Sequence, residues 1–148
     1  MTLTTVQDNQ SEVEIVSNKS AVETMLSAYI DCALRSTNDG SDESGGDPLE
    51  NNYSVDDIAI GTLERMRKDV ELFCLEHSAQ IEKWQGDVYN QYQQAGHDLW
   101  LTRNGHGAGF WESEWTDLPT NPGARLDAAA KRLGEVSLYV GDAGLIYC

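Results

Sequence analysis

The sequence predicts an α+β protein, in which N-terminal helices are followed by a hairpin–helix–hairpin unit that forms a small antiparallel sheet. Two observations predict this class. Apolar residues repeat at helical spacing from about residue 20 to residue 92. Glycine-rich turn sequences at Asn104-Gly105 and at 141–144 then separate short alternating segments. Helices grouped ahead of hairpins are typical of α+β domains.

The first predicted helix runs from Ser20 to about Leu34. Ser20 and Glu23 have the spacing of a capping box, and apolar residues follow at intervals of three, four and seven. Residues 1–19 are expected to be a flexible N-terminus. The rest of the chain, 20–148, is expected to form one domain, because 148 residues can bury a core without disulfides or metals.

An acidic loop is predicted between the first two helices. Residues 36–52, with the sequence STNDGSDESGGDPLENN, contain five acids, three glycines and few apolar side chains. Such a segment cannot bury enough apolar surface to offset the entropy lost on ordering, so we expect a mobile loop.

The next helices follow from Ser54 and Asp57, which signal a short helical start that breaks near Gly61. A longer helix is predicted over 62–76. Ser78 is a possible cap for a continuation that Ala95-Gly96 would end. The residues predicted to share the face of the longer helix are Leu63, Met66, Val70, Phe73 and His77.

The C-terminal part switches to a period of two. His97–Arg103 is predicted as a strand, Asn104-Gly105 as a type I′ turn, and His106–Glu112 as the return strand. Asn121-Pro122 then opens a helix that ends at Gly134, and residues 136–147 form the final hairpin.

Charge is the compositional outlier. The chain has a net charge of −15 and a pI near 4.3, and residues 1–60 contribute −10 of that charge. Direct binding to nucleic acid or to an anionic membrane surface is disfavoured, because both need a basic patch. The negative charge either keeps a small protein soluble or serves to bind a protein with a basic surface.

The pattern of cysteines and the lack of a recognisable targeting signal favour a cytoplasmic location. Cys32, Cys74 and Cys148 are odd in number and widely spaced, which is typical of free thiols in a reducing compartment. The N-terminus lacks the basic and apolar regions of a secretory signal, and no apolar run reaches the ~18 residues needed to cross a membrane. The oligomeric state is left open.

Motifs for catalysis, metals or cofactors are weak. Cys74 and His77 resemble half of a zinc knuckle without a second pair, so Cys74 is better interpreted as a packing residue. We predict no cofactor and no metal. An enzymatic alternative is a small hydrolase or metal-dependent enzyme whose site draws on the 97–112 hairpin and on Cys74 or His77. Its hairpin residues would be His97, Asp98, Arg103, His106 and Glu112.

The block AGHDLWLTRNGHGAGFW at 95–111, the ending SLYVGDAGLIY and the central ENNYSVDDIA resemble a family of small phage- and prophage-encoded proteins. The resemblance covers roughly residues 22–147. Leu99 and Glu112 stand where the family block has Phe and Asp. The resemblance implies a genetic setting, a phage acting in the cytoplasm of a bacterial host, and carries no catalytic residue over to this chain.

The phage setting implied by the resemblance and the negative charge together favour one function. In it, this acidic protein binds a host protein and modulates or inhibits it. The host protein would be a defence complex, a nuclease or another nucleic-acid enzyme. Partial mimicry of DNA is one way in which it could do so. Trp100, Trp111 and Trp115 belong either to the core or to an exposed aromatic patch. The residues predicted to contact the partner are Asp39, Asp42, Glu43, Asp47, Asp56, Asp57, Trp100, Arg103, His106 and Trp111.

Overall fold

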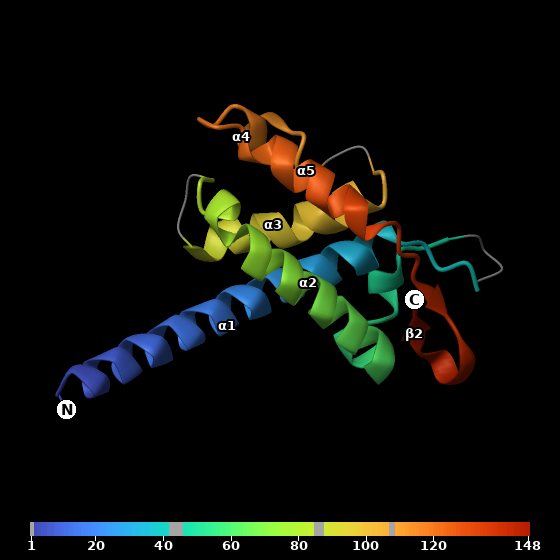
Figure 1. The fold of residues 1–148 in the computed structure, drawn as a ribbon. Coiled ribbons are helices and arrows are strands. Elements are labelled where there is room, and N and C mark those ends of the chain that lie inside the picture. The colour runs from blue at the N-terminus through green and yellow to red at the C-terminus, as the bar shows by residue number, and fades with distance from the viewer. Residues whose placement is uncertain (1, 42–45, 85–87, 107–108) are drawn as a thin grey trace.

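Two long helices packed along each other form the centre of the protein, which we describe from a computed structural model (Figure 1). The structure describes residues 2–41, 46–84, 88–106 and 109–148. Helix α1 (Thr2–Ser36) lies against α3 (Val88–Arg103), and α2 (Ile60–Ile81) crosses this pair. Helix α5 (Pro122–Leu133) covers α3 and α2, and the short α4 (Ser113–Thr116) packs on α5.

The last part of the chain forms the small antiparallel sheet. Strand β1 (Tyr139–Val140) pairs with β2 (Ile146–Tyr147) across a 3₁₀ turn, η3 (Asp142–Gly144). Ile58 bridges Ile146 from the other side, so the hairpin lies beside the beginning of α2 (Figure 1). The structure is therefore mostly helical with a two-stranded sheet, which confirms the predicted α+β class.

Helix α1 begins much earlier than predicted. It starts at Thr2 rather than at Ser20, and its first half projects away from the other helices in Figure 1. Residues 2–19 contain no glycine or proline, so no residue there breaks the helix. The apolar stripe predicted for the later part of α1 is confirmed, with Met25, Tyr29 and Ala33 fully buried.

The strand predicted at 97–103 is wrong. These residues form the second half of α3, and the buried side chains of Tyr92, Ala95, Leu99 and Thr102 follow helical spacing. Gly96 does not end this helix. A Cβ at Gly96 would lie 2.1 Å from the carbonyl oxygen of Met25, so the absence of a side chain lets α3 approach the backbone of α1.

The predicted turn at Asn104-Gly105 caps a helix instead of joining two strands. Gly105 has φ +68°, as the prediction required. However, its N–H donates to the carbonyl of Thr102, and the N–H of His106 donates to that of Leu101. This pair of bonds is the Schellman motif at a helix C-terminus. The return strand predicted at 106–112 is not found among its described residues, 106 and 109–112.

The remaining boundaries agree with the predictions more closely. Ser54 and Asp57 form a capping box around η2 (Val55–Asp57). Helix α2 contains the predicted face but runs on to Ile81, past a non-helical backbone at His77. Asn121 caps α5, with Pro122 in its first turn and Gly134 just after its end.

The ends of the segment predicted as a mobile acidic loop are packed. Asn38 bridges Pro48, and the Asp39 N–H donates to the Asp47 carbonyl at 2.8 Å. Leu49, in η1 (Leu49–Asn51), is buried in the core. Residues 42–45 lie outside the described part of the chain, so the prediction is corrected only for the residues that flank them.

Candidate functional site

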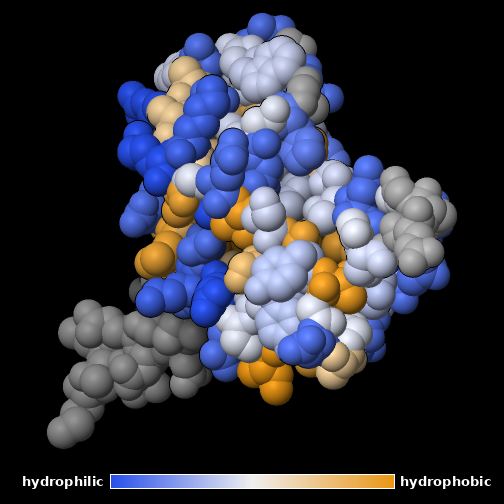
Figure 2. Space-filling model, turned by 90° about the vertical axis from the view of Figure 1, so that its right-hand side faces the viewer, coloured by the Kyte–Doolittle hydropathy of each residue, from blue (hydrophilic) through white to orange (hydrophobic). Residues whose placement is uncertain are grey.

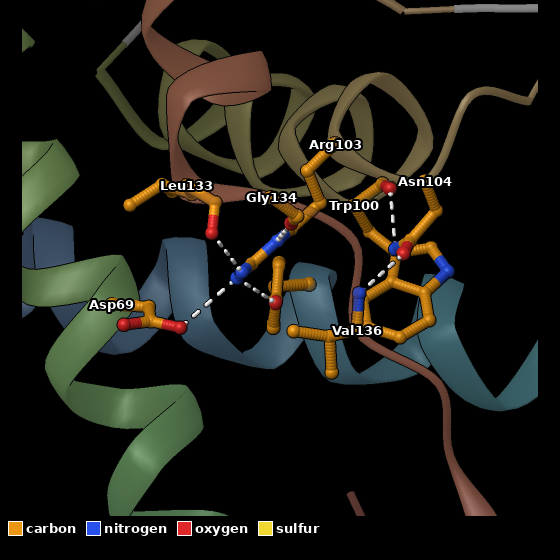
Figure 3. A network of polar contacts seen from close by, with 8 residues as sticks. Asp69, Trp100, Arg103, Asn104, Leu133, Gly134 and Val136 are labelled. Atoms are coloured by element: carbon orange, nitrogen blue, oxygen red, sulfur yellow. Dashed lines mark hydrogen bonds and ion pairs between the residues drawn. The ribbon is translucent and has the colours of Figure 1, made fainter.

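Arg103, predicted to contact a partner, is instead buried at the centre of a polar network (Figure 3). Its guanidinium donates to the carboxylate of Asp69 at 3.0 Å and to the Tyr29 hydroxyl at 3.0 Å. It also donates to the carbonyls of Gly134 at 2.8 Å and Leu133 at 3.2 Å. The network joins α1, α2, α3 and the end of α5, so the role of Arg103 is structural.

Trp100 is also buried, and its indole N–H donates to the Ser36 hydroxyl at 2.8 Å. Trp115 is buried too, whereas Trp111 is 53% exposed. Trp100 and Trp115 therefore belong to the core, as one of the two alternatives predicted. Of these three tryptophans, only Trp111 is exposed enough to contact a partner.

The acidic residues predicted to contact the partner also differ in exposure. Asp39 is buried, and its Oδ1 accepts hydrogen bonds from the N–H and the hydroxyl of Ser41, so it holds the base of the loop rather than a partner. Asp42 and Glu43 lie outside the described residues. The three others are at the surface: Asp47 and Asp56 are exposed and Asp57 is half-buried.

The residues of the enzymatic alternative do not meet at one place. His106 is exposed and lines a shallow cavity beyond the C-terminus of α3, whereas Arg103 is taken up by its network. The backbone of Glu112 leads into α4. Cys74 is buried on α2, where burial raises its pKa to about 11, and His77 packs on the Phe73 ring. The predicted packing role of Cys74 is consistent with this placement.

His97 and Asp98 do form a site, together with a residue that the sequence did not point to. Nδ1 of His97 lies 3.2 Å from Oδ1 of Asp98. Cys32 and His97 line a cavity of about 290 Å³ between α1 and α3. We call Cys32, His97 and Asp98 the thiol cluster.

Asp98 is held firmly in this cluster. Its side chain is 5% exposed, and its Oδ2 accepts hydrogen bonds from the Trp115 indole at 2.7 Å and from the Gln94 amide at 3.0 Å. Asp98 first, and Cys32 second, raise the pKa of His97 from its ordinary value of 6.5 to about 10. A charged imidazole is therefore expected at neutral pH.

A second feature lies at the end of the molecule formed by η2, the start of α2 and the C-terminal hairpin. Val55 is 44% exposed, Ile60 77% and Tyr139 56%. Backbone pairing holds them together, because Ile58 bridges Ile146 and the Ala59 N–H donates to the Ile146 carbonyl. The exposed acids of the same segments are Asp56 and Asp142. We call these five residues the end face.

The side of the molecule that carries the hairpin is mixed in character (Figure 2). Apolar side chains, drawn in orange, lie singly among hydrophilic ones rather than in one broad patch. A groove of about 210 Å³ between α1 and α2 adjoins the end face at Val55, and Leu26, Ile30 and Leu63 form its apolar lining.

The described parts of the chain contain neither a metal-binding cluster nor a membrane-spanning helix. Within those parts, no group of three or more His, Cys, Asp or Glu side chains is placed to hold a metal ion. Among the helices formed by these residues, none combines the length and the apolar character that a membrane span requires.

Comparison with protein-family models, with characterised proteins and with solved structures finds no match for this chain.

Proposed function

We propose that this chain is an acidic protein-binding module that modulates or inhibits another protein by covering a basic surface on it. The observation that carries the proposal is the end face, where exposed apolar side chains and carboxylates lie on segments that backbone pairing brings together. Exposed apolar groups rimmed by polar ones are typical of protein interfaces.

The apolar residues would provide the affinity. Ile60 is 77% exposed at the first position of α2, and Tyr139 stacks on Tyr147 with 5.8 Å between the ring centroids. A tyrosine supplies a large contact area at a low cost in conformational entropy, and a few such anchors dominate most interfaces.

The carboxylates would select and steer the partner. Arg35 and Arg67, both exposed, are already paired with Glu50 and Glu23, so they oppose the negative field only weakly. With a net charge of −15, the chain attracts a positively charged surface from a distance, which raises the association rate more than the affinity.

The partner class follows from this charge and from the resemblance to phage-encoded proteins. Host enzymes that handle nucleic acids carry basic grooves, and Asp47, Asp56 and Asp57 could take positions that phosphates otherwise occupy. We therefore propose a nuclease, defence complex or other nucleic-acid enzyme of a bacterial host as the partner, met in the cytoplasm. Trp111 and His106 are exposed and could add contacts.

The test is a binding assay with matched variants. A partner recovered from a bacterial lysate on the immobilised protein is purified, and its association rate is measured at several salt concentrations. We expect Ile60→Ser with Tyr139→Ser to weaken binding at least tenfold. Asp56→Asn with Asp142→Asn should slow association and reduce its salt dependence, because screening removes the long-range attraction.

The matched control carries the same charge change elsewhere. Glu114→Gln with Asp117→Asn alters two exposed acids around α4 and should leave binding close to that of the native protein. His97→Asn should also leave it unchanged. Equal effects of the two charge variants, or binding that does not depend on salt, would contradict the proposal.

A further inference from the structure

We propose that the outer edge of β1 binds an added strand, an extended segment with basic side chains that the partner protein supplies. The inference rests on the proposed function and deepens it, because it names the part of the partner that binds and the backbone groups that hold it. Pairing an extended peptide with the free edge of a sheet is a common mode of peptide recognition.

The hydrogen bonds of the hairpin show which way its backbone groups point. The Gly141 N–H donates to the Leu145 carbonyl at 2.8 Å, and the register of the strands places these two residues opposite each other. In an antiparallel ladder, hydrogen-bonded and non-hydrogen-bonded pairs alternate. The next pair, Val140 with Ile146, is therefore a non-hydrogen-bonded one, and the N–H and C=O groups of each residue point away from the opposite strand.

A separate bond agrees with this direction at Ile146. Its carbonyl accepts the N–H of Ala59 at 2.9 Å on the outer side of β2, where Ile58 forms a bridge. Val140, opposite Ile146, must then direct its N–H and C=O to the outer side of β1. Among the described residues, no strand or bridge pairs with β1 on that side. The hairpin lies at one end of the molecule, where another chain can approach it (Figure 1).

The segment before β1 limits the position of the added strand. The Val136 N–H donates to Oδ1 of Asn104 at 2.8 Å, so a side chain just after α3 already occupies this part of the segment. A cavity of about 360 Å³ has Ser137 and Leu138 in its lining. The added strand would therefore lie opposite residues 138–141, and the cavity offers room for a side chain at its end.

The charges around β1 favour a basic segment. Glu135 precedes the strand and Asp142 follows it, and both are exposed. Residues 134–148 contain no lysine or arginine. Two copies of this chain, each with a net charge of −15, repel each other, so a basic partner fits this edge better than a second copy does.

The two faces of the hairpin indicate the sequence pattern of the added strand. Val140 packs against the core on one face, whereas Tyr139 stacks on Tyr147 on the other and is 56% exposed. A lysine or arginine of the added strand beside Tyr139 would lie next to an aromatic ring, with which cations interact favourably. A segment in which basic and apolar residues alternate therefore suits this edge.

The probe is a short synthetic peptide in which lysine alternates with valine, acetylated and amidated at its ends. Its binding to the full chain is followed through the backbone amide signals in NMR spectra. We expect the largest shifts around Val140 and slower hydrogen exchange of the Val140 N–H when the peptide is bound. A peptide with glutamate in place of lysine should bind at least about tenfold more weakly, because its charge has the same sign as that of the protein.

The backbone pairing is tested with two substitutions at one position. Val140→Pro removes the N–H that points outward, and proline is tolerated on an edge strand where its nitrogen faces solvent. Val140→Thr keeps this N–H. We expect the proline variant to bind the basic peptide about fivefold more weakly than the threonine variant, the equivalent of one hydrogen bond. If the proline variant melts at a lower temperature, hydrogen exchange of Val140 in the native protein decides instead.

Unchanged exchange of the Val140 N–H in the presence of the basic peptide, or equal affinity for the basic and acidic peptides, would overturn the proposal. Shifts at Val140 that depend on protein concentration without any peptide would also overturn it, because they would place a second copy on this edge. The proposed function has its own test in the salt dependence of binding to the recovered partner, so either proposal can fail without the other.

Discussion

Gly96 on α3 packs directly on the main-chain carbonyl of Met25 on α1, so that a Cβ at Gly96 would lie 2.1 Å from that oxygen. A real Cβ cannot occupy this position, so Gly96→Ala must push the two helices apart. We expect the free energy of unfolding to fall by about 3 kcal/mol, at the upper end of the range for overpacked cores. Urea denaturation measures the change.

The matched control is Gly61→Ala on α2. A Cβ at Gly61 meets no atom within 4 Å, and alanine is the better helix former. The free energy of unfolding should therefore stay constant or rise by up to about 1 kcal/mol. Equal losses in the two variants would show that the contact with Met25 does not determine the result.

Replacing Arg103 should destabilise the protein more than replacing any exposed arginine. Arg103→Met leaves the carbonyls of Gly134 and Leu133 and the Tyr29 hydroxyl without their donor, in a site where Arg103 is 4% exposed. We expect a loss of about 3 kcal/mol, measured by urea denaturation. Arg35→Met, which removes an exposed ion pair with Glu50, should cost less than about 1 kcal/mol.

Position 105 requires glycine because of its backbone conformation and not because of crowding by neighbouring atoms. Its φ is +68°, and a Cβ there would meet no atom within 4 Å. Gly105→Val should lower the free energy of unfolding by about 2 kcal/mol, since a β-branched residue is strained in this conformation. Gly40→Val, at an exposed turn glycine without a positive φ, should change thermal melting little.

The pH dependence of the free energy of unfolding should reveal the protonation of His97. Its pKa in the folded protein is raised to about 10, mainly by Asp98, above its ordinary value of 6.5. The folded state then binds more protons than the unfolded state between these pH values. This stabilisation is complete below pH 6.5 and is lost as the pH rises through about 10. The difference in free energy of unfolding between the native protein and His97→Asn should shrink over that interval, and a constant difference would argue against a charged His97.

Local signals explain which elements the sequence predicts correctly. Asn121, Pro122 and Gly134 define α5 through capping chemistry that depends on adjacent residues alone. The final hairpin follows in the same way from the glycine-rich turn at 141–144. Neither element needs a distant partner in order to be recognised.

The region 97–112 shows where neighbouring residues alone are insufficient to predict the secondary structure. Asn-Gly can turn a hairpin or end a helix, because both conformations place glycine at positive φ. Leu99 and Leu101 are two positions apart, as on one face of a strand, but Tyr92, Ala95 and Leu99 also follow helical spacing. Contacts with α1 decide between the two, and they are absent from the sequence pattern.

The thiol cluster illustrates the same limit for function. His97 and Asp98 are adjacent and are recognisable as a potential pair, whereas Cys32 lies on another helix with no motif linking it to them. Only the packing of α1 on α3 places the thiol and the imidazole in the lining of one cavity. The signal that could have pointed to it was the presence of a free cysteine on a predicted core helix.

The pairing of α1 with α3 also determines how the chain reaches its folded state. The bond from the Trp100 indole to the Ser36 hydroxyl joins residues 64 positions apart, and α2 is formed from the intervening chain. Helices form within about a microsecond, but their central pair forms only after a long loop has closed. Although the protein is mostly helical, it should therefore fold more slowly than helical bundles in which consecutive helices pack on each other.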